Sequence, residues 1–424
     1  MTVPAPALPR AAPVLGVDFG TSNTAAAILE DGRPRRLAIE AGAETLPTAV
    51  FFPETGGAMR IGAAAAAALI AGEEGRYMRA LKSVLGTALF HEPRRIGGAR
   101  RTLADIVTAF LAELRARAAA EAGETFRQVL SGRPVRFHPD PDRDARALAD
   151  LRGCYHAAGF EEVRFLAEPE AAALAAAPVA APGDLSLILD IGGGTSDFSV
   201  FRRDGARTEI LASHGIRLGG TDFDREISLA HVMPLLGMGG ALRRSLGAGQ
   251  LPVPVALYRD LADWASIPFL YARETERAVA DLQAHAVEPG RIARLGRVIA
   301  EQLGHDLAFA VERGKIAANE GPGPALVGLE MIERGLEARI TPGSLAAALS
   351  GPREMLRRGI YDTLTAAGTP PTRIGSVILV GGSGLMRMVV EEAQAICPGA
   401  ALQRGAAFTA VVDGLALVGG GQEG

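Results

Sequence analysis

The sequence predicts an α/β protein built from two related lobes. Two segments, VLGVDFGTSNTAAAIL (14–29) and LSLILDIGGGTSDFSVF (185–201), carry this prediction. Each reads as an apolar strand, an aspartate, a glycine-bearing turn and a second strand, which indicates an internal repeat. The chain has 424 residues, of which 48% are hydrophobic, so it can bury the cores of two or three domains. We therefore expect a duplicated unit in which Asp18 and Asp190 end equivalent strands.

The composition argues against several classes of protein. A formal net charge of -4 provides no basic surface for nucleic acid or anionic lipid. No apolar run approaches the roughly 20 residues that a bilayer crossing needs. Cys154 and Cys397 lack the spacing of a disulfide framework or a zinc site. Residues 1–13 lack the order of a secretory signal, so we expect a disordered tail on a cytoplasmic protein that binds neither nucleic acid nor membrane.

The glycines of both repeats lie at the tip of a predicted hairpin. Walker and Rossmann loops instead place their glycines between a strand and a helix, and neither repeat is followed directly by a helix. A glycine-rich hairpin can present successive backbone N–H groups to an anion, and two facing hairpins would clamp a polyphosphate. An ordinary hairpin turn is the alternative for either copy alone. The glycines expected at the phosphates are Gly20, Gly192, Gly193 and Gly194.

Carboxylates beside these turns require a cation before a phosphate can approach them. Magnesium is the natural candidate, because it keeps most of its water and binds through one or two carboxylates and phosphate oxygens. We expect Asp18, Asp190 and Asp197 to face Mg²⁺ mostly through water.

A third glycine turn and two lysines are further candidates. In SVILVGGSGLMRMVVEEA (376–393), Gly381 and Gly382 would let a nucleoside lie against the backbone, with Ser383 as helix N-cap or ligand contact. A tight strand-to-helix turn is the alternative. Of the 44 basic residues only Lys82 and Lys315 are lysine, which favours positions where a compact ammonium matters.

These turns, in this order, resemble the actin-like ATPase superfamily and, within it, the heat-shock-70 chaperone family. The resemblance runs along nearly the whole chain and includes RALKSVLG (79–86), FLAEPEAAALAAA (165–177), IRLGGTDFDREI (216–227) and VERGKIAAN (311–319). It implies the actin-like ATPase fold, an α/β fold of duplicated ribonuclease H-like domains with a helical insert in the second lobe. The implied organisation is lobe I at 14–183, lobe II at 184–402 with the insert at about 228–305, and a return to lobe I with a C-terminal tail at 403–424.

The resemblance also implies roles for individual residues. It places Lys82, Glu168, Asp190 and Thr195 in catalysis, with Lys82 near the terminal phosphate and the attacking water. It places Thr21, Ser22 and Thr195 at the phosphates and Gly219 and Gly220 at the nucleotide. It places Glu312 and Lys315 at the ribose. The implied ligands are ATP or ADP with Mg²⁺, and the implied activity is slow hydrolysis of ATP to ADP and phosphate coupled to lobe closure.

Two departures from the family pattern affect the adenine site. Ile316 and Leu385 stand where the family usually carries arginines that sandwich the base, so weaker or altered adenine binding is expected. The longer second-lobe insert, and an end near residue 424 without a client-binding β-sandwich, resemble the short YegD-type branch.

A chaperone-related role with a protein client or co-chaperone follows from the resemblance. The alternatives are a nucleotide-dependent scaffold or regulator with little hydrolysis and a bacterial actin-like filament former. A sugar or acetate kinase would need an acceptor site, of which the sequence carries no mark.

Overall fold

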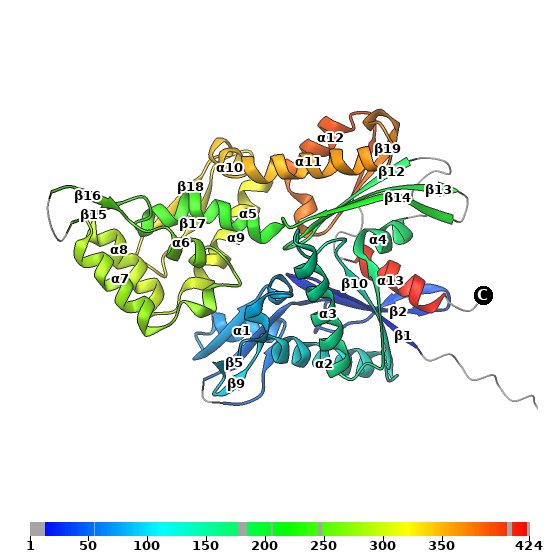
Figure 1. The fold of residues 1–424 in the computed structure, drawn as a ribbon, viewed down its shortest axis with the longest axis horizontal. Helices are drawn as coiled ribbons and strands as arrows, with labels where there is room; N and C mark the ends of the chain where they lie inside the picture. Colours follow the sequence, from blue (N-terminus) through cyan, green and yellow to red (C-terminus); the bar gives the residue numbers. More distant parts are fainter. Residues whose placement is uncertain are drawn as a thin grey trace, which may run out of the picture.

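The computed structural model describes residues 13–54, 56–176, 185–204, 207–244, 248–404 and 409–421. Figure 1 shows two large sheets, one drawn from strands β1 to β11 and one drawn from strands β12 to β20, with helices between them and on their outer faces. This architecture confirms the predicted actin-like ATPase fold class. Most of the expected N-terminal tail, the expected lobe boundary at 183–184 and residues 422–424 of the expected C-terminal tail lie outside the described residues.

The first large sheet carries the first predicted hairpin at its centre. Its strands follow the order β11-β10-β1-β2-β3, and β4 also pairs with β2. They are β1 (Val14–Phe19), β2 (Asn23–Glu30), β3 (Arg33–Arg36), β4 (Thr45–Pro47), β10 (Gln128–Arg133) and β11 (Glu162–Ala167). β1 runs parallel to β10 and antiparallel to β2, and Asp18 pairs with Ala25. Asp18 therefore stands next to the hairpin tip.

Two helices complete the outer side of this sheet. α2 (Leu103–Ala122) begins at a capping box formed by Thr102 and Asp105, and it ends at Gly123, whose φ is 71°. α3 (Pro141–Ala157) starts with a proline after Asp140, whose side chain accepts from the backbone N–H of Arg143. The apolar face of α2 packs on β1 in a buried cluster.

A smaller unit extends from the first lobe toward the second-lobe insert. It holds a sheet of order β6-β5-β7 and a separate two-stranded hairpin. Its elements are β5 (Ala49–Pro53), β6 (Arg60–Ile61), α1 (Ala63–Ile70), β7 (Gly75–Arg79), the 3-10 helices η1 (Leu81–Val84) and η2 (Ala88–His91), β8 (Arg94–Ile96) and β9 (Ala99–Arg101). Lys82 lies on η1, directly after β7.

The second large sheet repeats the plan of the first. Its order is β14-β13-β12-β19-β20, with β12 antiparallel to β13 and parallel to β19. The strands are β12 (Leu185–Ile191), β13 (Ser196–Asp204), β14 (Arg207–Ile216), β19 (Ile374–Val380) and β20 (Ala401–Arg404). Asp190 is opposite Asp197 across the hairpin. α11 (Ser350–Ala366), which packs on β13 and β14, and α12 (Arg387–Ile396) belong to this sheet.

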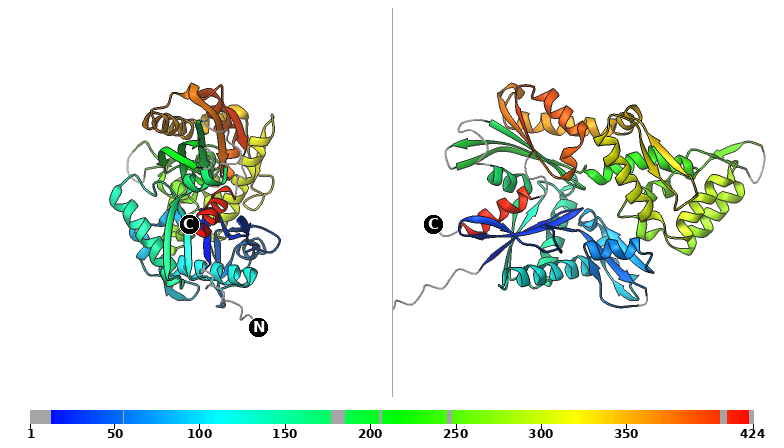
Figure 2. Two further views of the ribbon diagram at one scale, coloured as in Figure 1. Left: turned by 90° about the vertical axis from the view of Figure 1, so that its right-hand side faces the viewer. Right: turned by 180° about the vertical axis from the view of Figure 1, so that it is seen from behind.

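Two crossing helices, α4 (Glu168–Ala176) and α13 (Ala410–Gly420), lie between the two sheets (Figures 1 and 2). A buried apolar cluster joins them to β10 on one side and to β12 and β19 on the other. The crossing is close, because a Cβ on Gly414 would lie 1.8 Å from the carbonyl oxygen of Ala171. Glu168, the first residue of α4, is thereby placed between the sheets.

The second lobe carries a long, mainly helical insert. The elements beyond its sheet are α5 (Gly220–Ile227), the π-helical turn η3 (Ser228–Val232), the 3-10 helices η4 (Met233–Leu236) and η5 (Ile267–Phe269), β15 (Ala241–Arg243), β16 (Gln250–Pro252), α6 (Ala256–Leu261), α7 (Arg273–His285), α8 (Pro289–Ala300), α9 (Gly304–Glu320), β17 (Ala325–Gly328), β18 (Glu337–Ile340) and α10 (Pro342–Ala348). The β15–β16 hairpin is an addition to the helices that were predicted there.

The insert approaches the small unit of the first lobe. Phe269 packs against the core of the first lobe, and Trp264 packs against Ala80 of that lobe. In the described ranges, none of the helices has the length and hydropathy to traverse a membrane.

Candidate functional site

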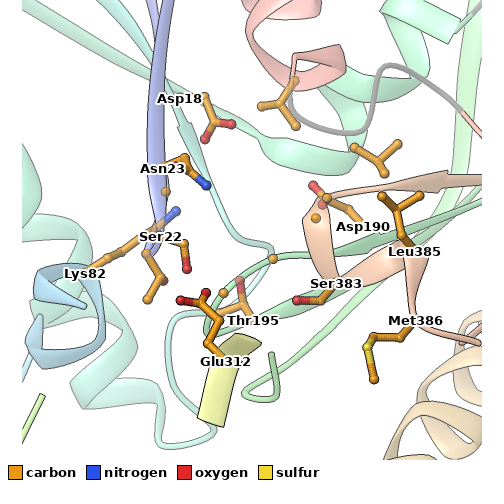
Figure 3. A pocket seen from close by; sticks show the side chains of 18 of the residues that line it. Asp18, Ser22, Asn23, Lys82, Asp190, Thr195, Glu312, Ser383, Leu385 and Met386 are labelled. Carbon is orange, nitrogen blue, oxygen red and sulfur yellow. The ribbon is translucent and has the colours of Figure 1, made fainter. Parts of the chain in front are cut away.

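A cavity of about 390 Å³ lies where the three predicted glycine turns meet. Figure 3 shows Asp18, Ser22 and Lys82 entering it from the first lobe, and Asp190, Thr195 and Ser383 from the second. Other predicted residues that line it are Gly20, Thr21, Glu168, Gly192, Gly193, Glu312, Lys315, Gly381 and Gly382. The volume lies within the range of ordinary small-molecule pockets.

The two hairpins close in the same way and touch each other. The backbone N–H of Gly20 donates to the carbonyl of Asn23 over 3.0 Å, and that of Gly192 donates to the carbonyl of Thr195 over 2.9 Å. A Cβ on Gly193 would lie 2.4 Å from Ser22 Oγ and 3.2 Å from the Ser22 backbone nitrogen. The glycine at this position therefore allows the two tips to meet at one cavity.

Four predicted residues support the cavity from behind and do not line it: Gly194, Asp197, Gly219 and Gly220. The N–H of Gly220 donates to the carbonyl of Gly192 over 3.0 Å, so the start of α5 holds the second hairpin in place. A Cβ on Gly219 would lie 2.4 Å from the nitrogen of Gly194. Asp197 is buried, and its carboxylate accepts from the backbone N–H of Val135 over 2.7 Å.

The third turn approaches the second hairpin through another glycine. Gly381 has a φ of 78°, and a Cβ there would lie 2.3 Å from the carbonyl oxygen of Ile191. Both the conformation and the space require glycine. Ser383 lies in the 3-10 helix η7 (Gly382–Leu385), whereas α12 begins at Arg387 with Met386 as its N-cap. The N-cap interpretation of Ser383 is therefore wrong, because an extra helical turn separates the glycines from α12.

The aspartates that end the paired strands face an excess of negative charge. Burial, together with the charge of Glu168, raises the pKa of Asp18 to about 7 against the opposing effect of Lys82. The same causes, burial first, raise the pKa of Asp190 well above its ordinary value. Neither carboxylate has a cationic side chain of its own within ion-pair distance among the described residues. A cation between the hairpins would relieve this cost.

Lys82 is held by a buried ion pair. Its Nζ donates to Glu168 Oε1 over 2.6 Å, and the two residues are only 6% and 7% exposed. Burial alone would lower the pKa of Lys82, but the charges of Glu168 and Asp18 outweigh it and raise the pKa. The ammonium therefore stays charged at the wall of the cavity.

The two residues predicted at the ribose each have a protein partner. Lys315 Nζ lies 2.7 Å from Asp224 Oδ1, so α9 is tied to α5 beside the second hairpin. Glu312, one turn earlier on α9, binds the guanidinium of Arg79 at 3.0 Å and 3.3 Å. Burial would raise the pKa of Glu312, but the charge and hydrogen bonds of Arg79 lower it.

Two large apolar side chains stand at the end of the cavity beside α9, next to polar residues of that helix. Ile316 and Leu385 line it and are 46% and 38% exposed, which is unusual for large apolar side chains. The Asn319 side chain joins the two walls, donating to the carbonyl of Leu385 over 3.3 Å and accepting from the N–H of Arg387 over 2.7 Å. An uncharged planar ring would find apolar faces here.

The carboxylates at the cavity suit a magnesium ion that they contact mainly through its bound water. Over the described residues there is no cluster of three or more His, Cys, Asp or Glu side chains that could ligate a metal directly. Mg²⁺ needs only one or two carboxylates when phosphate oxygens and waters complete its shell. Asp18 and Asp190, for which the described ranges offer no cationic side chain at ion-pair distance, are the residues that suit such an ion.

Sequence reasoning missed Arg79, Asn319 and Asp224, although each lies inside a segment that it singled out. Arg79 stands three positions before Lys82 but was not distinguished from the many other arginines. Asn319 is the last residue of the matching segment 311–319. A polar residue at a fixed spacing from a predicted ligand is the only signal that could have found them.

A family model matches part of the chain. The model described as Hsp70 protein matches residues 94–234. The matched range contains Glu168, Asp190 and the whole second hairpin, and it ends within η4. The first hairpin and the third turn lie outside the match, but both line the same cavity as the matched residues.

Proposed function

We propose that this chain hydrolyses ATP slowly and closes its lobes around the nucleotide. The chain belongs to the actin-like ATPase and Hsp70 family, and it is therefore an Hsp70-like ATP-binding protein. The observation that carries this proposal is the meeting of two equivalent hairpins at one cavity. Each hairpin contributes a carboxylate that, within the described part of the chain, has no cationic side chain at ion-pair distance. A polyphosphate with its magnesium ion supplies the ligand that both features require.

The backbone amides and hydroxyls of the hairpins bind the phosphates. Thr21, Ser22 and Thr195 supply hydroxyl groups, and the glycines between them let phosphate oxygens approach the backbone. Asp18 and Asp190 would hold the hydrated Mg²⁺, which would neutralise phosphate charge, and Asp197, bound to Val135 behind the cavity, would add negative charge around its water shell. Glu312 and Lys315 bind the ribose, and Gly381 and Gly382 lie beneath the nucleoside.

Catalysis rests on positioning and electrostatics. Lys82 places its ammonium beside the terminal phosphate, where it stabilises the charge that develops during in-line attack by water. Glu168 fixes the position of that ammonium, and Asp190 and Thr195 orient the water and the phosphate. We expect slow turnover, because the metal, the backbone amides and Lys82 contribute more to catalysis than a strong general base does.

Nucleotide state is transmitted through lobe closure. The lobes that close are 14–183 and 184–402, with the insert at about 228–305 and residues 403–424 returning to the first lobe. ATP and ADP differ in the contacts that the terminal phosphate makes with both hairpins, so they favour different degrees of closure. The closed form presents a surface for a protein client or co-chaperone in a chaperone-related role.

Calorimetry with ATP, ADP and GTP, each with and without Mg²⁺, tests this function. We expect ATP and ADP to bind with a strong requirement for Mg²⁺, and GTP to bind more weakly. Single-turnover phosphate release then measures hydrolysis. Failure of any nucleotide to bind in the presence of Mg²⁺ would reject the proposal.

A nucleotide-dependent scaffold with little hydrolysis is the second candidate. The ion pair between Lys82 and Glu168 favours it, because an ammonium already held at 2.6 Å is less free to follow the phosphate during the reaction. Bound ATP that stays intact over many hours in the single-turnover assay would select this alternative.

A further inference from the structure

One cluster of side chains crosses from the first lobe to the second at the edge of the candidate site. We call it the Arg79 cluster, and its members are Tyr77 and Arg79 on β7 and Trp264, Phe309 and Glu312 of the second lobe. Arg79 and Glu312 both line the cavity, whereas Trp264 lies behind them. At this cluster, as at the hairpin tips, a wall of the cavity is also a contact between the lobes.

Arg79 is at its centre and is bound in two ways. Its guanidinium carbon lies 4.6 Å from the ring centroid of Trp264 and 5.7 Å from that of Phe309. Its two terminal nitrogens donate to the two carboxylate oxygens of Glu312 over 3.0 Å and 3.3 Å. Only a planar, forked cation can stack on a ring and bind a carboxylate through two bonds together.

The rings hold the guanidinium away from solvent. Trp264 is 1% exposed, and its centroid lies 5.1 Å from that of Phe309, which in turn lies 6.0 Å from that of Tyr77. The Arg79 side chain is 11% exposed. Burial would lower its pKa, but the charge and hydrogen bonds of Glu312 raise it. Both partners therefore remain ionised.

Stability alone is a weak reason for such a pair, because a buried ion pair is often no better than apolar residues of similar size. Its place suggests another role. The fork fixes the plane of the Glu312 carboxylate and uses one lone pair of each oxygen, which leaves the others to accept from hydroxyl groups in the cavity. Withdrawing β7 from α9 would break the fork and the ring contacts together.

We propose that Arg79 is a positioning residue that orients Glu312 toward the ribose hydroxyls of the nucleotide and locks the two lobes at the cavity edge. The proposal rests on the proposed function, since it names what regulates the nucleotide at that same site. Its consequence is slow nucleotide release, because the fork, the ring stacking and the ribose contacts must open together.

A double-mutant cycle tests the inference. The variants are Arg79→Gln, Glu312→Gln and the two combined, with Arg60→Gln as the matched control. Arg60 on β6 also makes a two-bonded pair, with Glu73, and lies over Phe51, but it is exposed and outside the cavity. The readouts are the affinity for ADP and for 3′-deoxy-ADP by calorimetry, and the release rate of ADP. The fluorescence of Trp264, the single tryptophan of the chain, reports the cluster directly.

We expect each single variant to weaken ADP binding by about tenfold, the scale of one lost charged hydrogen bond. The double variant should also lose about tenfold, well short of a hundredfold, because Arg79 acts through Glu312. The preference for ADP over 3′-deoxy-ADP should shrink, ADP release should accelerate and the Trp264 emission should shift, while R60Q behaves as wild type. Arg79→Lys keeps the charge without the two-bonded guanidinium contact, so it should retain only part of the affinity for ADP. This variant replaces R79Q in the cycle if R79Q does not fold.

Two results would overturn the inference, and they are distinguishable. In the first result, the wild-type protein binds ADP, and R79Q has the same affinity, sugar preference and release rate as R60Q. This result would reject the role of Arg79 and leave the proposed function standing. Wild-type protein that binds no nucleotide would reject the proposed function and this inference with it.

Discussion

Replacing Lys82 by methionine removes the only basic side chain that the described structure places within ion-pair distance of Glu168. The two groups meet at 2.6 Å and are almost fully buried. Methionine retains much of the apolar stem of lysine, so packing changes little. The main effect is a carboxylate left in the cavity wall beside Asp18 and Asp190, whose raised pKa values Lys82 partly offsets.

Breaking a buried pair in this way costs about 3 to 5 kcal/mol of unfolding free energy, because one charge stays buried without its partner. Replacing both members, as Lys82→Met with Glu168→Gln, removes that charge. We expect the double variant to recover to within about 1 to 2 kcal/mol of wild type. R60Q, which breaks an exposed pair, should cost at most about 1 kcal/mol.

Urea denaturation of the nucleotide-free protein at pH 7, followed by Trp264 fluorescence, measures these differences. Single-turnover phosphate release in the same variants separates stability from catalysis, since both Lys82 variants should bind ATP yet fail to hydrolyse it. A single variant as stable as wild type would refute the electrostatic argument. A single variant with normal turnover would refute the catalytic role of the lysine.

Three further predictions concern the hairpins and the base. In Gly193→Ala the new Cβ would lie 2.4 Å from Ser22 Oγ, so we expect the free energy of unfolding in urea to fall by about 1 to 3 kcal/mol. In the control Gly192→Ala the nearest contact is at 3.4 Å, and the fall should be less than about 1 kcal/mol. Folding raises the pKa of Asp18 from 3.8 to about 7, so the folded protein binds more protons than the unfolded chain between these pH values. The free energy of unfolding without nucleotide should therefore fall as the pH rises across this window. In urea denaturation measured from pH 4 to 8, Asp18→Asn should make this fall smaller. Ile316→Arg places a cation near the base and should strengthen ADP binding by about 2- to 30-fold, equivalent to about 0.5 to 2 kcal/mol; unchanged affinity by calorimetry would show that the base does not lie there.

The repeat could be predicted from the sequence because short local sequence patterns define it. Asp18 and Asp190 each end an apolar strand before a glycine turn, and such strands form hairpins whose tips are fixed by the residues themselves. That the two tips share a cavity followed from the resemblance between the repeats. The structure places them there through α4 and α13, which pack against both sheets.

Contacts across the lobes could not be predicted in this way. Arg79 meets Glu312 and Trp264 only after the second lobe packs against the first, and no periodic pattern links positions so far apart. Asp197 has the residue type of a ligand, yet its carboxylate accepts from Val135 behind the cavity. Residue type and spacing identify such candidates, whereas orientation depends on tertiary packing.

Hydrogen exchange of the backbone amides tests the central claim most directly, because it reports separately on residues 20–22 and 192–195 in one experiment. The account predicts that ATP with Mg²⁺ slows exchange in both hairpins together, and that ADP protects them less because it lacks the terminal phosphate. Protection confined to one hairpin, or found in neither, would contradict a ligand clamped between the two.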